Sequence, residues 1–399
     1  MDKIKEKILN IPFLGCIIAT SYKILKLLIE KTIILTNKID SKKIVVCNFG
    51  GKGYGDNPKY IVEEIINQGL GYDIVWLVEN VGKYTDSFPK EVRLVEYGSI
   101  KGIYELATAK FWIDNCRKYF YTSKRKGQYY IQTWHGGIGI KLIEKEAGDA
   151  LDEEYIKKAK NDSKMADLLL SNSRWCTEMY KESFWYDGDI LECGSPRVDI
   201  LFNINENIKN KIYKKYKLDD DTNILLYAPT FRNSMDLSVY SLDYNKCLET
   251  LKNKFGGNWA IFVRLHPNIS HLANEIDCSE KVINVTDYPD MQELLSVSSI
   301  LVSDFSASIF EFSFIKKPIF IFATDYEDYI KERGFKISFD TLPFRINRSN
   351  EELFEDIIMF NKEEYVSQLE EMHKYFGVYE NGKASKTVVD KIKVIHNGG

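Results

Sequence analysis

Short apolar runs rich in β-branched residues alternate with helical stretches along most of the chain from Lys42 onward. In the first half these runs lie at 43–48, 73–79, 91–97, 110–115, 129–134, 166–173 and 189–194. Segments 58–70 and 100–109 between them have the apolar spacing of amphipathic helices. Strands that alternate with helices predict a mainly parallel sheet with helices on both faces.

The same alternation returns in the second half, after a polar, lysine-rich stretch between Asp199 and Asp221. Strand-like runs follow at 223–232, 258–267, 281–286, 300–314 and 317–323, with a helix expected over 289–299. We therefore predict two doubly wound, Rossmann-like α/β domains that face a cleft. The predicted limits are 1–40 for an N-terminal helical segment, 41–205 and 206–345 for the two domains, and 346–399 for a C-terminal tail of two helices.

The N-terminal segment has a pattern of its own. Residues 8–22 are apolar but too few to span a bilayer, and the stretch that follows keeps helical spacing with lysines interspersed. An interfacial amphipathic helix fits this pattern. A helix packed on the protein's own core fits it equally well, because the pattern does not say which apolar surface is covered.

Composition narrows the class of protein. A length of 399 residues favours two domains, and 44% hydrophobic with 28% charged residues is typical of a soluble globular protein. The formal net charge of -4 argues against a dedicated nucleic-acid binder. The seven cysteines are scattered, without a CxxC pair or a Cys/His cluster at metal spacing, so we expect reduced, structural cysteines in the cytosol and no metal.

Polar or glycine-rich segments directly follow most of the predicted strands. They are 49–57, 135–137, 194–197, 229–232, 266–268 and 303–308. Because the carboxyl ends of parallel strands meet at one edge of a sheet, these segments are expected to line a ligand-binding cleft.

Two histidines occupy such positions. His135 stands between a strand and two glycines, where an imidazole can take a hydroxyl proton near neutral pH. A His held by a backbone carbonyl is the alternative, but the placement favours function. His266 follows Arg264 by two residues, and this pair suggests anion binding, although Arg264 could instead pair with a carboxylate. The other histidines, His271, His373 and His396, are expected at the surface.

The stretch 303–312 places hydroxyl and acidic side chains ahead of a predicted helix that carries Glu311. The N-terminus of a helix offers unpaired N–H groups and a partial positive charge, so it can bind phosphate. Plain helix capping by Asp304 and the serines is the alternative. The glycine-rich stretch 49–57 matches neither GxxxxGK[ST] nor GxGxxG and is expected to be a flexible cleft loop near the acceptor.

Seven motifs in sequence order carry a family resemblance. They are GKGYGDNPKYI, QTWHGG followed by Lys141, GSPRVD, YAPTFR, VRLHP, VSDFSAS and DYEDY. Together they resemble the CDP-glycerol glycerophosphotransferase family of teichoic acid and capsule synthesis, over roughly residues 43 to 335.

The resemblance implies a GT-B fold and an enzyme that moves a polyol phosphate from a CDP-activated donor to a hydroxyl of a lipid-linked saccharide or polymer, releasing CMP. It needs no cofactor besides this donor. Together with the N-terminal segment, it implies a cytoplasmic protein, peripheral at the inner face of the bacterial cell membrane.

Residue roles follow from the same resemblance. His135 would deprotonate the acceptor, while His266, Ser306 and Ser308 would hold the donor's pyrophosphate. The expected substrate-binding residues are Gly136, Lys141, Arg197, Thr230, Arg232, Arg264, Pro267, Ser303, Asp304, Ser306, Ser308 and Glu311.

The chain departs from the family pattern at two places. Many members have WHGTPLK where this chain has WHGGIGIK, and many have Asp where this chain has Glu311. These departures leave the acceptor contacts and the role of the acidic residue open, so the polyol could be glycerol, ribitol or a less usual one. A GT-B sugar-nucleotide glycosyltransferase and a non-catalytic scaffold of a capsule complex remain as alternatives, and the oligomeric state is open.

Overall fold

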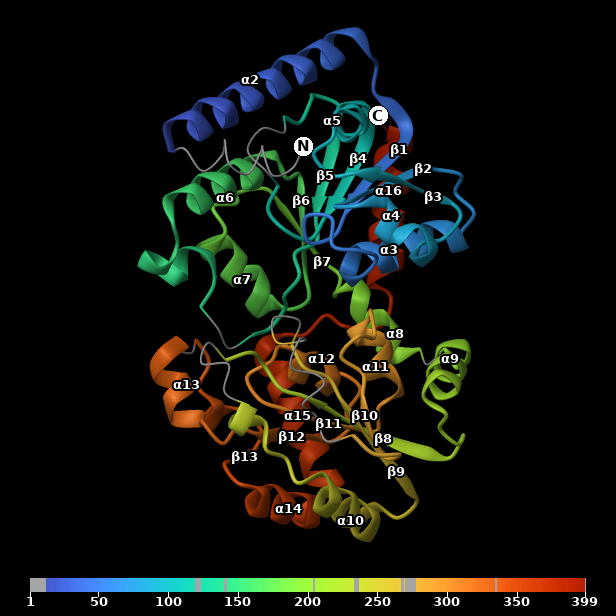
Figure 1. Ribbon diagram of the computed structural model, residues 1–399, viewed down its shortest axis with the longest axis vertical. Coiled ribbons are helices and arrows are strands. Elements are labelled where there is room, and N and C mark those ends of the chain that lie inside the picture. Colours follow the sequence, from blue (N-terminus) through green and yellow to red (C-terminus); the bar gives the residue numbers. More distant parts are fainter. Residues whose placement is uncertain are drawn as a thin grey trace.

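The computed structural model describes most of the chain and divides it into two α/β halves (Figure 1). The described residues are 12–118, 123–139, 142–203, 205–232, 237–266, 269, 278–333 and 336–398. The first half lies in the upper part of Figure 1 and the second half in the lower part.

The first half is built on a parallel sheet whose strand order is β3-β2-β1-β4-β5-β6-β7. Its strands are β1 Asp40–Cys47, β2 Asp73–Val78, β3 Val92–Glu96, β4 Ala109–Asp114, β5 Tyr129–Gln132, β6 Leu168–Ser171 and β7 Asp189–Glu192. Most of these strands are short apolar runs buried on both faces, as expected for a sheet between two helical layers.

Helices cover both faces of this sheet. They are α3 Asp56–Asn67, α4 Val81–Tyr84, α5 Ile100–Thr108, α6 Glu153–Met165, α7 Arg174–Ser183 and α16 Ala384–Gly398, with short 3₁₀ turns η1 Thr85–Ser87, η2 Glu144–Ala150 and η3 Pro196–Val198. Ser99, Asp152 and Ser173 cap α5, α6 and α7 by accepting a backbone N–H of the first turn.

The second half repeats the architecture with a parallel sheet in the order β10-β9-β8-β11-β12-β13. Its strands are β8 Thr222–Ala228, β9 Asn258–Val263, β10 Val282–Asn284, β11 Ile300–Ser303, β12 Ile319–Phe322 and β13 Ile346–Asn347. The helices are α8 Asp199–Phe202, α9 Glu206–Tyr216, α10 Tyr244–Phe255, α11 Met291–Val297, α12 Ser308–Ser313, α13 Tyr326–Arg333, α14 Asn350–Met359 and α15 Lys362–Phe376, with η4 Leu237–Tyr240 and η6 Phe339–Thr341.

The prediction of an α/β protein with parallel sheets is confirmed. Both sheets have a switch in strand order, between β1 and β4 and between β8 and β11, where ligands bind in open α/β sheets. The limits drawn at 205 and 345 stay predictions. β7 and β8 lie on either side of the first limit.

The prediction of two helices in the tail is wrong, because the chain from Asn350 forms α14, α15 and α16. Gly377 ends α15 in a left-handed conformation, with φ 61°, that glycine adopts without strain. The chain then returns to the first half, where Val388, Val389 and Ile392 of α16 join the core around β1 and α3. Figure 1 shows α16 in red among the blue elements of this half.

The N-terminal segment contains a long helix, α2 Pro12–Thr36, which lies across the top of the first half in Figure 1 and packs on α5. Lys26 Nζ donates to the carbonyl of Gly98 at 2.5 Å, and Glu30 accepts the backbone N–H of Ser123 at 2.8 Å. Among the helices of the described residues, none is both long and apolar enough to cross a membrane.

Candidate functional site

A cavity of about 510 Å³ lies between the two halves, at the carboxyl ends of their strands. Its lining residues are Trp134, His135, Gly136, Gly137, Gly139, Ile143, Glu146, Trp175, Met179, His266, Phe305, Ala307 and Lys336. The structure therefore brings together the two histidines singled out by sequence, one from each sheet.

The segment that carries His135 leaves β5 by a tight turn. Trp134 adopts φ 54°, a left-handed conformation that is unfavourable for a bulky residue, so the surroundings must hold it. The side chain of Gln132 accepts the N–H of Trp134 at 2.9 Å, and Asn57 of α3 donates to the carbonyl of Trp134 at 3.0 Å. These bonds fix the backbone directly before His135.

Two glycines after His135 let the chain pass close to a neighbouring loop. A Cβ atom at Gly137 would lie 2.2 Å from the Nδ2 atom of Asn172. Gly137 is the first position of this motif at which the chain departs from the family pattern, and the buried side chain of Asn172 occupies the space that a side chain there would need.

The imidazole of His135 has a defined tautomer. Its Nδ1 atom lies 2.7 Å from the carbonyl oxygen of Asn115, which can only accept, so Nδ1 carries the proton and Nε2 keeps its lone pair. Burial lowers the pKa of His135 from 6.5. The neutral, basic form is therefore the one present near neutral pH.

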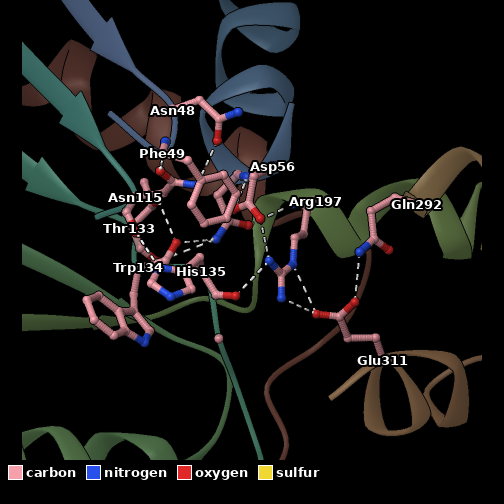
Figure 2. A network of polar contacts seen from close by, with 12 residues as sticks. Asn48, Phe49, Asp56, Asn115, Thr133, Trp134, His135, Arg197, Gln292 and Glu311 are labelled. Carbon is pink, nitrogen blue, oxygen red and sulfur yellow. Dashed lines mark hydrogen bonds and ion pairs between the residues drawn. The ribbon is translucent and has the colours of Figure 1, made fainter. Parts of the chain in front are cut away.

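Asn115 is itself fixed, as Figure 2 shows. Its side chain donates to Asn48 at 2.8 Å and accepts the backbone N–H of Phe49 at 2.8 Å. Phe49 is a second non-glycine residue in the left-handed region, with φ 44°. The loop after β1 and the end of β4 thus hold the carbonyl that orients His135.

Aromatic rings hold the imidazole from the side. The ring centroid of Trp134 lies 4.3 Å from that of His135, and Phe49 lies at 5.2 Å. The guanidinium of Arg117 lies 5.2 Å from the ring of Trp134 and pairs with Glu144 and Asp162. His135 can rotate little in this arrangement.

Arg197 links His135 to the second half (Figure 2). Its side chain donates to the carbonyl of His135 at 2.8 Å, to Asp56 at 2.5 Å and, through Nε, to Glu311 at 3.0 Å. Gln292 donates to the second carboxylate oxygen of Glu311 at 2.8 Å. Arg197 and Glu311, both expected to bind substrate, therefore bind each other across the two halves.

A second polar cluster closes the carboxyl edge of the other sheet. Asp304 accepts the N–H and the hydroxyl of Thr230 at 2.9 and 3.0 Å. Arg232 pairs with Asp304 at 2.8 Å and with Asp325 at 2.5 Å. The hydroxyl of Ser303, fully buried, donates to the carbonyl of Ala228 at 2.6 Å. In this structure these four expected substrate-binding residues bind one another or the backbone of the same edge.

The stretch before α12 is only partly as expected. α12 begins at Ser308 with Ala307 as its N-cap, which makes no side-chain cap bond, but the hydroxyl of Ser306 accepts the backbone N–H of Ser308 at 3.3 Å, so one serine contributes to capping as the alternative expected. The hydroxyl of Ser308 donates to that of Ser306 at 2.9 Å. Ala307, between them, lines the cavity, which leaves the expected phosphate contacts of these serines as predictions.

His266 is exposed and lines the cavity, with its ring 5.9 Å from that of Phe231. Arg264 donates to the backbone carbonyls of Tyr288 at 2.5 Å and Val285 at 3.3 Å, and burial lowers its pKa. Its guanidinium thus braces the loop after β10. Lys141, Pro267 and His271 lie outside the described residues.

One histidine expected at the surface is not there. His373 of α15 is half-buried, packs on Phe314 and lies 2.9 Å from the hydroxyl of Ser313. Burial lowers its pKa to about 4, so this side chain is neutral and structural.

Sequence reasoning missed several residues of the site. Asn48, Asp56, Asn57 and Asn115 position His135 or Arg197, while Glu146, Trp175 and Lys336 line the cavity. Asn48 and Asn115 are the last residues of the predicted strands 43–48 and 110–115, and Asp56 and Asn57 end the glycine-rich stretch 49–57, which is the signal that could have found them. Within the residues that the structure describes, no group of three or more His, Cys, Asp or Glu side chains is placed to hold a metal ion.

Comparisons with known proteins identify the family of this chain. The family described as CDP-glycerol:poly(glycerophosphate) glycerophosphotransferase matches residues 29–394. A teichoic acid poly(glycerol phosphate) polymerase of Staphylococcus epidermidis is 30% identical over 376 residues, which cover 90% of this chain and 52% of that protein. A polymerase of the same description from Bacillus spizizenii is 28% identical and is covered over 92% of its length.

The solved structure of the wall teichoic acid polymerase TagF is also similar. It superposes with a TM-score of 0.80 at 29% identity and covers 94% of both chains. The chain thus spans about half the length of the first polymerase and nearly all of the chain in the solved structure.

Proposed function

Because this chain belongs to the family of CDP-glycerol:poly(glycerophosphate) glycerophosphotransferases, we propose that it transfers a polyol phosphate from a CDP-activated donor to a hydroxyl of a teichoic acid polymer or lipid-linked saccharide. The observation that carries this proposal is the state of His135. Its Nδ1 is bound to a carbonyl, its Nε2 is basic, and it shares one cavity with His266.

The arrangement of the two halves supports a GT-B type of fold. Each half has a doubly wound parallel sheet, and the cavity lies where the carboxyl edges of the two sheets face one another. In such an arrangement the acceptor approaches from the side of His135 and the donor is held by the second half.

The proposed reaction is an in-line displacement at phosphorus. Nε2 of His135 takes the proton of the acceptor hydroxyl, whose oxygen attacks the β-phosphorus of the donor. The bond between that phosphorus and the bridging oxygen breaks, and CMP leaves with the electron pair. His266, Ser306 and Ser308 would hold the pyrophosphate oxygens, because imidazole and hydroxyl groups can donate hydrogen bonds to phosphate.

The decisive experiment measures the released nucleotide. The protein is incubated with CDP-glycerol, CDP-ribitol or a UDP-sugar, each with and without a soluble glycerol phosphate oligomer. We expect acceptor-dependent release of CMP, which is lost in His135→Ala. Release of UDP would show a sugar-nucleotide glycosyltransferase, and release of neither nucleotide would show a scaffold without catalysis.

We also propose that α2 binds the protein to the inner face of the cell membrane. On this helix two charged side chains are buried and several leucines are exposed, which is the reverse of the distribution on a helix packed against a protein core. Lys26 and Glu30 face inward and are 9% and 5% exposed, whereas Leu25 and Leu28 are 53% and 57% exposed. An apolar groove of about 560 Å³ between α2 and α5 includes Leu28 and is also lined by Lys101, and Lys31 of α2 is exposed. Apolar side chains flanked by lysines are what an anionic bilayer surface binds.

A further inference from the structure

An ion pair crosses the cavity that contains both histidines. Glu146 lies in η2 of the first half, and Lys336 follows α13 of the second half, 190 residues later in the sequence. Figure 1 shows α13, in orange, on the same side of the molecule as α6 and α7 of the first half. The two side chains line the same cavity as His135 and His266, although none of the motifs above includes them.

One oxygen of the carboxylate in this pair accepts no hydrogen bond from the described residues. Glu146 binds Lys336 through Oε1, while Oε2 is shielded from solvent and has no hydrogen-bond partner among the described residues. A carboxylate oxygen shielded from water without a donor is unfavourable. A ligand hydroxyl at this wall of the cavity would supply the missing donor once the carboxylate turns Oε2 towards it.

The ammonium of Lys336 offers positive charge at the same place. It carries three N–H donors, so a bond to one carboxylate oxygen leaves capacity for a second anion. Its Nζ also lies 5.2 Å from the centre of the Trp175 ring, a cation–π contact that helps to fix its position.

The walls around this pair are apolar. Ile143, Trp175, Met179 and Phe305 line the cavity together with Trp134. Flat aromatic and aliphatic surfaces fit a short carbon chain and do not bind water well. A cation, a carboxylate oxygen in need of a donor and an apolar wall together match a phosphate that carries a small hydroxylated carbon chain.

We propose that Lys336 and Glu146 form a subsite for one polyol phosphate unit, in which Lys336 binds the phosphate and Oε2 of Glu146 accepts a hydroxyl of the polyol. This inference rests on the proposed function and deepens it. The unit is either the glycerol phosphate of the donor or the terminal unit of the acceptor, which have the same chemistry, so the two sources are separated by experiment.

The test measures binding to the full chain by calorimetry, without turnover. The ligands are CDP-glycerol, CMP, which lacks the polyol phosphate, and a synthetic trimer of glycerol phosphate. The variants are Lys336→Gln, Lys336→Arg and Glu146→Leu. Lys246→Gln and Glu249→Leu are matched controls, because these residues form an exposed ion pair on α10.

We expect Lys336→Gln to lower the affinity for CDP-glycerol or for the trimer by roughly ten- to a hundredfold, which is the usual effect of losing a charged hydrogen bond. The affinity for CMP should change by less than about twofold. Lys336→Arg should keep most of the affinity, and Glu146→Leu should weaken the same ligand. A loss of affinity for CDP-glycerol assigns the subsite to the donor, and a loss of affinity for the trimer assigns it to the acceptor.

Unchanged affinity for both polyol ligands would overturn the proposal. An equal loss of affinity for CMP would overturn it too, because that result would show that the ion pair only holds the two halves together. If the variants show the expected losses of affinity but the wild type releases no CMP, the proposed function is contradicted and the proposal of the subsite still holds.

Discussion

The Nδ1 atom of His135 lies 2.7 Å from the carbonyl oxygen of Asn115, so the proton of the imidazole is held away from the cavity and Nε2 is left as its base. Burial lowers the pKa of His135 below 6.5, which keeps this base neutral in mildly acidic solution.

The first prediction concerns activity and pH. Because a lowered pKa keeps Nε2 deprotonated to lower pH, the decline of kcat/KM in acid should be centred below pH 6.5. His135→Ala should lower turnover by about 10²–10⁴-fold and leave the affinity for CDP-glycerol nearly unchanged. A decline that is centred above pH 6.5, or full activity in the variant, would contradict the assignment of His135 as the base.

The second prediction separates a structural role of Arg197 from a substrate-binding one. Arg197→Gln leaves the carboxylates of Asp56 and Glu311 buried without a cation, which should destabilise the fold by about 3–5 kcal/mol in urea unfolding. Arg345→Gln, which removes an exposed pair with Glu355, should change stability by only about 0–1 kcal/mol. A stable Arg197→Gln protein with weak donor binding would instead support the substrate contact.

The third prediction tests the close approach at Gly137. Gly137→Ala places a Cβ atom 2.2 Å from Asn172, and relief of this clash should cost about 1–3 kcal/mol in stability and shift the nearby His135. Adding Asn172→Ala should restore much of the loss. Gly139→Ala is the control, since its Cβ would meet no atom closer than 3.8 Å. Equal stability of the variants at 137 and 139 would rule out the clash.

The fourth prediction uses Glu380, which lies in the loop between α15 and α16. Both of its carboxylate oxygens accept the N–H of Ser195, at 3.0 and 3.1 Å, and desolvation raises the pKa of Glu380 from 4.5 to about 8. The folded state therefore favours the protonated carboxyl. Its contribution to stability is present below pH 4.5 and is lost as pH rises towards 8.

Glu380→Gln cannot titrate and keeps an oxygen that accepts the N–H of Ser195. The stability of this variant relative to the wild type should therefore increase from pH 5 to pH 8.5 in urea unfolding. Glu371→Gln, at an exposed position of α15, should show no such trend. A constant difference between wild type and Glu380→Gln across this range would disprove the raised pKa.

The fifth prediction tests membrane binding by α2. The wild type should sediment with vesicles that contain phosphatidylglycerol, and salt should weaken this binding, because lysines near an anionic surface contribute roughly 1 kcal/mol each. A Leu25→Glu and Leu28→Glu double variant should lose the binding. Met359→Glu, at a 76% exposed position of α14 at the opposite end of the molecule, should keep it (Figure 1). Binding that survives the double variant would exclude α2 as the anchor.

Much of the fold could be predicted because its strands are buried on both faces. The run 73–79 matches β2, and 110–115 matches β4 within one residue, since a strand between two helical layers reads as a short apolar run. The partner of α16 could not be predicted. The spacing of Val388 and Ile392 indicates an apolar helix face but not that this face packs on the first half, far away in the sequence.

For the site, the sequence could predict which residues lie at strand ends near the cavity, but not which of them contact one another. His135 stands at a strand end, so its position in the cavity followed from topology. Arg197 contacts Asp56 and Glu311, which are 141 and 114 residues away, and nothing local distinguishes such an arginine from one that binds phosphate. The sequence could not indicate the partner of Ser303 either, because the carbonyl of Ala228, to which its hydroxyl donates, lies on another strand.

The return of α16 to the first half sets an order of assembly during synthesis. The second sheet and its helices are encoded without interruption between Asp199 and Phe376, so that half can finish its core as soon as this stretch has left the ribosome. The first half lacks Val388, Val389 and Ile392 until α16 has emerged as well. The half translated first is therefore the last to close, and until then the exposed side of β1 and α3 is an apolar surface on which a chaperone or another nascent chain can bind.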